Sequence, residues 1–279
     1  MTGPLSKASG LGHQNGMLFL RSLAFNIAFY ILLFGLVVFG APVMFFGRHG
    51  VFALARTWAR AAFWLQRVIC GVHVEFRGVE NVPKGAFIMA AKHQSVWETF
   101  ALTLFAPDYS FLLKRELTWI PFFGWMLISS EQIVVDRAKG GSALMQAVRK
   151  SRALLEQGRQ IIVFPEGTRR AVRAAPAYKP GVAAIYGNCN AVCVPVALNS
   201  GLFWPRRQFL RRPGAIVVEF LPPIQPGMDK KAFMRLLAEQ IETASTRLAE
   251  EALARDPALA EAFPLPPQDE PAPKNGGKA

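Results

Sequence analysis

The sequence predicts an α/β domain, a mixed sheet flanked by helices, preceded by an N-terminal membrane-associated helical segment. From residue 72 onward, short runs rich in β-branched residues alternate with amphipathic stretches, which is typical of strands and helices that follow one another. Before that point, residues 22–47 carry no charged side chain. About 20 apolar residues are enough to cross the hydrocarbon layer of a bilayer.

The composition along the chain indicates four regions. We expect an N-terminal tail over 1–21, membrane-anchoring helices over 22–70, the main domain over 71–254 and a disordered tail over 255–279. The last region consists of proline, glycine and isolated charges, so it buries too little apolar surface to order itself.

The membrane segment is expected to be retained, because it is longer than the apolar stretch of a signal peptide. Behind it, Arg56, Arg60 and Arg67 alternate with aromatic residues, which indicates a basic helix on an anionic membrane surface. A core helix with snorkelling arginines is the alternative. Basic residues are denser after the apolar run than before it, which predicts an inner-membrane protein whose main domain faces the cytoplasm. Residues 22–47 either span the bilayer or turn back with 51–70 as a hairpin.

The main domain is expected to contain seven strands and four helices. The strands are predicted at 72–76, 86–90, 110–113, 133–135, 160–164, 192–197 and 215–220. Helices are predicted at 97–105, 142–157 and 181–186, and a last one begins near Asp229 as an N-cap. An apolar stripe at helical spacing on that helix predicts core positions at Phe233, Leu237, Ile241, Ala244 and Leu248.

The net charge of +13 fits nucleic acid, anionic lipid or a phosphorylated substrate equally well. The sequence contains neither a basic reading helix nor a stacking platform, so a nucleic-acid partner is not expected. The three cysteines are odd in number and lack CxxC spacing. Neither a disulfide framework nor a zinc site is therefore predicted.

Four polar clusters, at 91–99, 112–125, 163–170 and 194–201, lie at or just beyond the ends of predicted strands, where open α/β sheets bind ligands. In the first cluster, His93 and Glu98 would point about 140° apart on one regular helix. They meet if His93 lies in the turn before the helix and Glu98 in its first turn. The carboxylate would then fix the imidazole tautomer and stabilise the imidazolium. The alternative is a surface histidine beside an unrelated glutamate.

The third cluster, FPEGTRR, has the character of a phosphate clamp. Backbone N–H groups near Gly167 and Thr168 and the guanidinium groups of Arg169 and Arg170 would converge on an oxyanion. A basic loop is the alternative. In the second cluster, Lys114 and Arg115 either add charge to the same pocket or form a solvated pair. The aromatic segment 119–125 either holds an acyl chain or packs on the membrane side.

Together and in this order, the clusters resemble those of the glycerolipid acyltransferase family over about residues 70–205. Its best-known bacterial members make phosphatidic acid from lysophosphatidic acid. The resemblance implies that His93 is the general base and that Glu98 orients it. It associates the acceptor phosphate with Glu166, Gly167, Thr168 and Arg169, beside which Arg170 stands in the clamp pattern, and it associates the acyl chain with Pro195. From the residues themselves, Lys114 and Arg115 are candidates for oxyanion or substrate contacts, and Pro121, Phe122 and Gly124 are candidates for acyl binding. The sequence departs from the family pattern in having Glu98 in place of aspartate and Lys92 in place of asparagine.

The resemblance implies acyl transfer from acyl-acyl-carrier protein or acyl-CoA to the sn-2 hydroxyl of lysophosphatidic acid at a membrane, without cofactor or metal. The alternatives are an acyltransferase acting on another lysolipid, such as lyso-ornithine lipid, and a non-catalytic membrane-anchored lipid-binding protein. A serine hydrolase is not expected, because no Gly-x-Ser-x-Gly elbow occurs. Zinc catalysis is not expected either, because His-Glu-x-x-His is missing.

Overall fold

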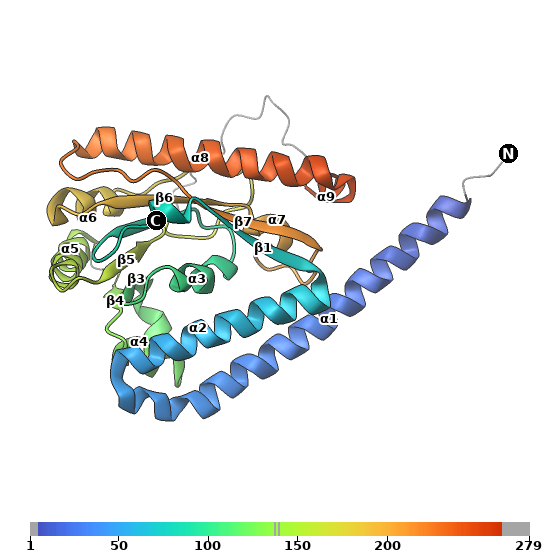
Figure 1. Ribbon diagram of the computed structural model, residues 1–279, viewed down its shortest axis with the longest axis horizontal. Coiled ribbons are helices and arrows are strands. Elements are labelled where there is room, and N and C mark those ends of the chain that lie inside the picture. Colours follow the sequence, from blue (N-terminus) through green and yellow to red (C-terminus); the bar gives the residue numbers. More distant parts are fainter. Residues whose placement is uncertain (1–4, 137, 139, 264–279) are drawn as a thin grey trace.

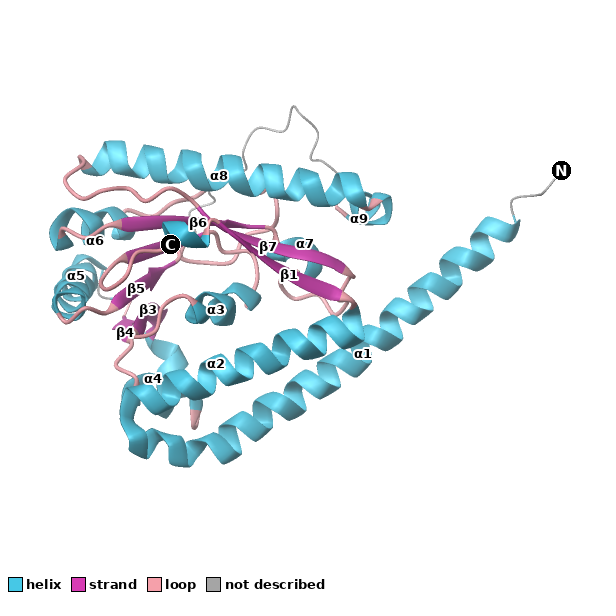
Figure 2. Ribbon diagram, in the orientation of Figure 1, coloured by secondary structure: helices cyan, strands magenta, loops and turns pink. Residues whose placement is uncertain are grey.

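The computed structural model describes residues 5–136, 138 and 140–263. Its centre is one seven-stranded sheet with helices on both faces, and two long N-terminal helices lie along one side (Figure 1). Figure 2 shows the same arrangement by secondary structure. The predicted class, an α/β domain with a mixed sheet behind an apolar N-terminal helix, is confirmed.

The strand order is β1-β7-β6-β2-β5-β3-β4. Among the described strands, β6 and β7 pair antiparallel and every other pairing is parallel. Thus β2, β3, β4, β5 and β6 end at one common edge of the sheet, and β1 and β7 run the opposite way. The strands are β1 (Val72–Arg77), β2 (Ile88–Ala91), β3 (Tyr109–Lys114), β4 (Ile133–Val135), β5 (Gln160–Val163), β6 (Cys193–Leu198) and β7 (Gly214–Phe220). All seven agree with the sequence prediction to within two residues.

Two helical layers cover the sheet. On one face lie α1 (Leu5–Gly40), α2 (Gly47–Leu65) and α3 (Trp97–Ala101), and on the other lie α5 (Gly140–Glu156), α6 (Gly181–Cys189) and α8 (Lys230–Arg255). Shorter helices are α4 (Phe123–Ser129), α7 (Ser200–Phe203) and α9 (Pro257–Ala262). Short 3-10 or π turns occupy Ala41–Phe46, Gln66–Cys70, Val79–Asn81, Leu102–Leu104 and Arg115–Trp119.

Side-chain periodicity explains how the layers join. In β2, Met89 and Ala91 pack toward α1, α2 and α3, whereas Ile88 and Ala90 pack toward α5, α6 and α8, as alternation along a strand requires. The α8 stripe predicted from the sequence is buried throughout. Asp229 accepts hydrogen bonds from the N–H groups of Lys231 and Ala232, which confirms the predicted N-cap.

The N-terminal helices form a hairpin, because α1 turns at Ala41–Phe46 and α2 returns beside it (Figure 1). Within α1, Gly16–Gly40 is long and apolar enough to cross a membrane. One side of α1 buries Phe25 and Phe29, and the other exposes Ile31, Phe34 and Phe39. The chain therefore carries an apolar helix suited to membrane association.

The ends of the described chain differ from the expected boundaries. Helix α1 begins at Leu5 and passes through Arg21 without a break, because an exposed arginine does not terminate a helix. At the other end, α8 stops at Arg255 and α9 occupies the first part of the expected tail. Residues 264–279 lie outside the described residues.

Candidate active site

Three adjacent strands bring the polar clusters together. The order β6-β2-β5 places the ends of these parallel strands side by side. The turns after β2 and β5 carry His93 and Glu166, and Ser200 is the first residue of α7, which follows β6. A site built from these residues lies at the carboxyl edge of the sheet, where ligands bind in this class of fold.

His93 and Glu98 are in direct contact. His93 lies in the turn after β2 and Glu98 is the second residue of α3, so the chain reverses between them. His93 Nδ1 is 2.9 Å from Glu98 Oε1. An N–H at Nδ1 that donates to the carboxylate leaves Nε2 as an acceptor. The pair has the geometry of a general base and its orienting group.

The Glu98 carboxylate is fully buried and accepts three further hydrogen bonds. The N–H groups of Gln94 and Ser95 each donate to Oε1 at 2.7 Å, and Ser200 Oγ donates to Oε2 at 2.8 Å. With the His93 contact, three of these four contacts are made by Oε1 and one by Oε2. Both oxygens of the acidic partner of His93 are therefore engaged.

A capping box explains why this position holds glutamate. In the stretch from Ser95 to Glu98, Ser95 Oγ accepts from the N–H of Trp97, and Glu98 reaches back to the N–H of Ser95. The Ser-x-x-Glu spacing and the return contact of the glutamate resemble a capping box, although the serine hydroxyl accepts from the N–H of Trp97 and not from that of Glu98. The same carboxylate thus starts α3 and contacts His93. The Ser-x-x-Glu spacing is the local signal from which Ser95 could have been added to the predicted site.

Glu166 contacts the backbone of the turn that carries His93. It is buried, Oε2 accepts from the N–H of His93 at 3.1 Å, and Oε1 accepts from Lys92 Nζ at 3.0 Å. The expectation that Glu166 contacts an acceptor phosphate does not fit this position, because both oxygens are engaged and a carboxylate repels a second anion. From the same loop, the N–H of Arg170 donates to the carbonyl of His93 at 2.8 Å.

Lys92 is buried between two carboxylates. Besides Glu166, its ammonium group contacts both oxygens of Glu242 on α8, at 2.7 and 2.9 Å. Tyr178 donates a hydrogen bond to the same Glu242 carboxylate, and burial is the main cause that raises the pKa of Tyr178 far above its usual range. Sequence reasoning does not find Glu242 and Tyr178, because no local pattern links residues so distant in the chain.

Aromatic stacking fixes the plane of the imidazole. The His93 ring lies 4.0 Å from the ring of Phe164, with 17° between their planes. Phe164 stands between β5 and the turn that carries Glu166. The histidine is therefore held at its edge by Glu98 and on one face by Phe164, with its side chain 14% exposed.

The other residues of FPEGTRR take different positions. Gly167 has φ of +64°, in the left-handed region that favours glycine, and Thr168 is exposed. Arg170 Nε lies 4.0 Å from Glu166 Oε1. Arg169 is partly exposed: burial lowers the pKa of its guanidinium, and the charge of Arg206 lowers it further. Of the two predicted clamp arginines, only Arg170 lies within ion-pair distance of a carboxylate among the described residues.

The second cluster begins at the end of β3, the strand next to β5 in the sheet. Lys114 and Arg115 are exposed where β3 ends, and Arg115 pairs with Asp136 at 3.0 Å. This pairing favours the solvated alternative for Arg115 over a contact with substrate.

The predicted acyl-binding residues lie in two environments. Pro121 and Phe122 are exposed, and Gly124 is buried where a Cβ would lie 2.1 Å from the carbonyl oxygen of Thr118, so only glycine fits. Pro195 is buried in β6 opposite Ala90. The large apolar side chains exposed around the first group are Leu117, Trp119, Ile120, Phe122, Phe123, Trp125 and Ile128.

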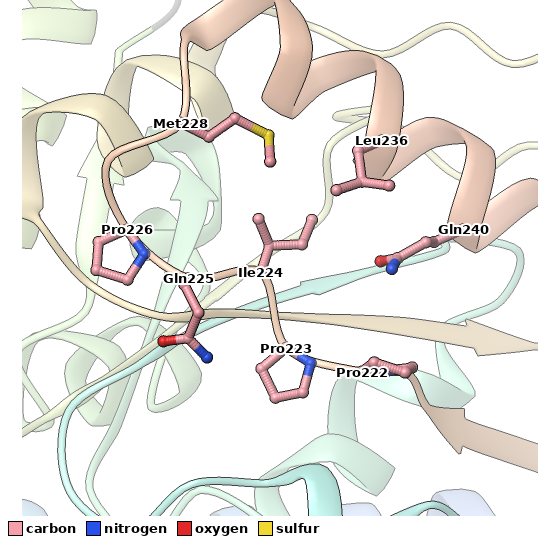
Figure 3. A pocket seen from close by; sticks show the side chains of 8 residues that line it. All are labelled: Pro222, Pro223, Ile224, Gln225, Pro226, Met228, Leu236 and Gln240. Carbon is pink, nitrogen blue, oxygen red and sulfur yellow. The ribbon is translucent and has the colours of Figure 1, made fainter.

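No metal centre is evident in the part of the chain that the structure describes, where no group of three or more His, Cys, Asp or Glu side chains is placed to hold an ion. A pocket of about 490 Å³ lies between the loop after β7 and α8 (Figure 3). Because β7 runs antiparallel to β6, this loop lies at the opposite edge of the sheet from His93. The pocket and the candidate active site are therefore separate.

Comparison with known proteins gives consistent matches. Residues 73–199 match the family model described as Acyltransferase. The chain is 37% identical over 204 residues to the 1-acyl-sn-glycerol-3-phosphate acyltransferase of Pseudomonas aeruginosa, covering 71% of this chain and 79% of that one. It is 29% identical over 215 residues to the enzyme of that name from Saccharomyces cerevisiae, covering 75% and 70%. The fold matches the crystal structure of the 1-acyl-sn-glycerophosphate (LPA) acyltransferase from Thermotoga maritima, with a TM-score of 0.70, 24% identity and coverage of 82% and 96%.

Proposed function

The chain belongs to the acyltransferase family, and from this membership we propose that it acylates the sn-2 hydroxyl of lysophosphatidic acid to form phosphatidic acid in phospholipid biosynthesis. The observation that carries the proposal is the hydrogen bond between His93 and the buried Glu98. It leaves His93 Nε2 free to accept a proton, as general base catalysis requires.

The proposed reaction is a single displacement. His93 Nε2 takes the proton of the acceptor hydroxyl while the hydroxyl oxygen attacks the thioester carbonyl of the donor. The tetrahedral adduct collapses, the carbon–sulfur bond breaks, and the imidazolium returns its proton to the leaving thiolate. The products are an ester and a free thiol, and His93 ends in its starting form. A positioned base contributes roughly 10²- to 10⁴-fold to such a reaction.

The neighbours of His93 have distinct proposed roles. Glu98 holds the tautomer and stabilises the imidazolium. Glu166 and Lys92 fix the turn that carries His93, and Arg169 contacts the acceptor phosphate. The N–H groups of His93, Gln94 and Ser95 already donate to carboxylates, so the donor that stabilises the oxyanion comes from another group.

We place the protein at the cytoplasmic membrane, with the catalytic domain facing the cytoplasm and the α1–α2 hairpin lying in one leaflet. The support is that Phe25 and Phe29 of α1 pack on Trp204 of the catalytic domain, and a helix crossing the bilayer would lose these contacts. The apolar side chains exposed around α4 extend the face that would meet lipid.

The test is acyl transfer by the detergent-solubilised protein with acyl-CoA and acyl-acyl-carrier protein as donors. Lysophosphatidic acid and lyso-ornithine lipid serve as acceptors. We expect transfer to lysophosphatidic acid, and loss of transfer in His93→Ala. The matched control is His73→Ala, because His73 is exposed on the edge strand β1.

Full activity of His93→Ala would show that His93 is not the general base and would reject the proposed mechanism. Transfer to lyso-ornithine lipid alone would overturn the acceptor. If the wild-type protein transfers no acyl group from either donor, the chain is instead a lipid-binding protein without activity.

A further inference from the structure

The loop between α7 and β7 has no role in the reaction described above. Its residues 205–212 read PRRQFLRR, with arginines at 206, 207, 211 and 212. Arg206, Arg207 and Phe209 are exposed, whereas Arg211 is buried. An exposed basic and aromatic loop beside a lipid-modifying site is a candidate for ligand recognition.

Both ends of this loop are fixed. Trp204, just before it, packs edge-on against Phe25 and Phe29 of α1, with ring centroids 5.3 and 5.1 Å apart, and against Phe100 of α3 at 6.0 Å. At the other end, the Arg211 guanidinium lies over the Trp204 ring, 4.6 Å from its centroid. The exposed arginines between these anchors are therefore presented from a positioned loop.

The loop also lies against the apolar helix α1. Asn26 Nδ2 donates to the carbonyl of Phe209 at 3.2 Å, and the N–H of Arg211 donates to Ser22 Oγ at 2.9 Å. The Phe209 ring lies 5.2 Å from that of Phe19. This is the side of the molecule from which a membrane lipid would approach.

The other contact of the loop is with the candidate active site. Arg206 Nη1 donates to the carbonyl of Arg169 at 3.2 Å, and the next residue, Arg170, donates from its N–H to the carbonyl of His93. Burial lowers the pKa of Arg169 most, the charges of Arg206 and Arg207 lower it further, and the charge of Glu98 raises it. Arg206 therefore links the loop to Arg169, whose neighbour Arg170 contacts the backbone of His93, and Arg207 follows Arg206 in the sequence.

The guanidinium groups of Arg169, Arg206 and Arg207 are available to an anionic ligand. Among the described residues, no carboxylate forms an ion pair with Arg169, Arg206 or Arg207, whereas Arg170 approaches Glu166. Gathering like charges raises their mutual repulsion, and a multiply charged anion placed between them removes it. A guanidinium group can donate two parallel hydrogen bonds to two oxygens of one phosphate, in a bidentate contact.

We propose that Arg206 and Arg207 complete, with Arg169, the site for the phosphate monoester of the lysophospholipid acceptor, and so determine acceptor specificity. The inference rests on the proposed function. In lysophosphatidic acid, the reacting hydroxyl and the phosphate ester stand on adjacent carbons, so the phosphate lies close to His93 during the reaction. The anionic groups of a CoA or carrier-protein donor lie a whole pantetheine arm away from the thioester.

The test compares the double variant Arg206→Gln/Arg207→Gln with wild type in steady-state acyl transfer. The matched control is Lys231→Gln/Arg235→Gln, which removes two exposed charges from α8 on the opposite face of the sheet. We expect the KM for lysophosphatidic acid to rise at least about tenfold, as for the loss of hydrogen bonds to a charged group. The KM for the donor should stay at the wild-type and control values. Inhibition by monoacylglycerol should also stay unchanged, because this lipid lacks the phosphate.

Other outcomes overturn the proposal. An unchanged KM for lysophosphatidic acid in an active enzyme rejects the loop as part of the site, and a rise confined to the donor KM assigns the arginines to the donor. The double variant could instead lose binding to phosphatidylglycerol vesicles and lose activity to the same extent at all acceptor concentrations. That result assigns Arg206 and Arg207 to contact with the membrane surface. A wild-type protein that does not acylate lysophosphatidic acid instead rejects the proposed function.

Discussion

The charges on the two sides of His93 are arranged in opposite ways. On the buried side, Lys92, Glu98 and Glu166 are each bonded to a partner inside the protein. On the open side, Arg169 and Arg206 have no carboxylate partner among the described residues. A buried charge is costly unless it is paired, so the buried set is suited to holding geometry. The exposed set keeps its charge available for a ligand.

The largest effect is expected from Glu98→Gln. The amide keeps the shape of the side chain and an acceptor for His93, but it removes the negative charge that stabilises the imidazolium. We expect kcat to fall on the order of 10²- to 10⁴-fold with little change in the urea midpoint of unfolding. Glu98→Asp, which keeps the charge but shortens the reach to the N–H groups of Gln94 and Ser95, should lie between. Wild-type kcat in Glu98→Gln would show that the carboxylate acts only as a helix cap.

Glu166→Gln separates positioning from phosphate binding. The variant leaves the buried Lys92 with one carboxylate fewer and weakens the hold on the N–H of His93. We expect the free energy of unfolding to fall by about 1–3 kcal/mol and kcat to fall, with the KM for lysophosphatidic acid unchanged. Chemical denaturation and steady-state kinetics measure both. A rise in this KM without loss of stability would return Glu166 to the phosphate site.

A double-mutant cycle tests the pairing of Lys92 with Glu242. Lys92→Asn removes the cation between Glu166 and Glu242, and Glu242→Gln removes one of the two carboxylates that contact Lys92. Each single variant therefore breaks the same ion pair, and the double variant breaks it only once. We expect the double variant to lose less stability than the sum of the singles, by about 0.5–3 kcal/mol. Strict additivity in urea unfolding would mean that the two side chains do not stabilise each other.

The smallest effect is expected from ionic strength. Salt screens exposed charges far more than buried pairs, so raising it should increase the KM for lysophosphatidic acid severalfold while the unfolding midpoint changes little. A kinetic series in sodium chloride at constant detergent concentration measures this. The opposite result would be a KM that does not change with salt and an unfolding midpoint that falls. It would mean that Arg169 and Arg206 stabilise the fold and do not bind the ligand.

The sequence predicted those features that have a local pattern. Alternation located the strands, and the apolar stripe located the core side of α8. The spacing of His93 and Glu98 predicted that the two meet if a turn carries His93 and the following helix carries Glu98. The contact of Lys92 with Glu242 and that of Arg206 with Arg169 depend on how distant elements pack. The reversed direction of β1 and β7 likewise follows from packing, and no residue in either strand encodes it. Glu166 was assigned to the phosphate because it lies in the block that resembles the family's Pro-Glu-Gly-Thr motif, whereas its side chain contacts Lys92 and the N–H of His93.

Trp204 has a practical consequence for protein production. Its ring lies between α1, through Phe25 and Phe29, and α3, through Phe100, and α3 carries Glu98. The first helix is therefore part of the same core as the catalytic helix. A truncation designed to obtain a soluble catalytic domain by removing α1 would uncover this aromatic cluster and loosen the support of α3. Soluble preparations are better sought by replacing the outward side chains of α1, such as Ile31, Phe34 and Phe39, with polar residues while its inner face is kept.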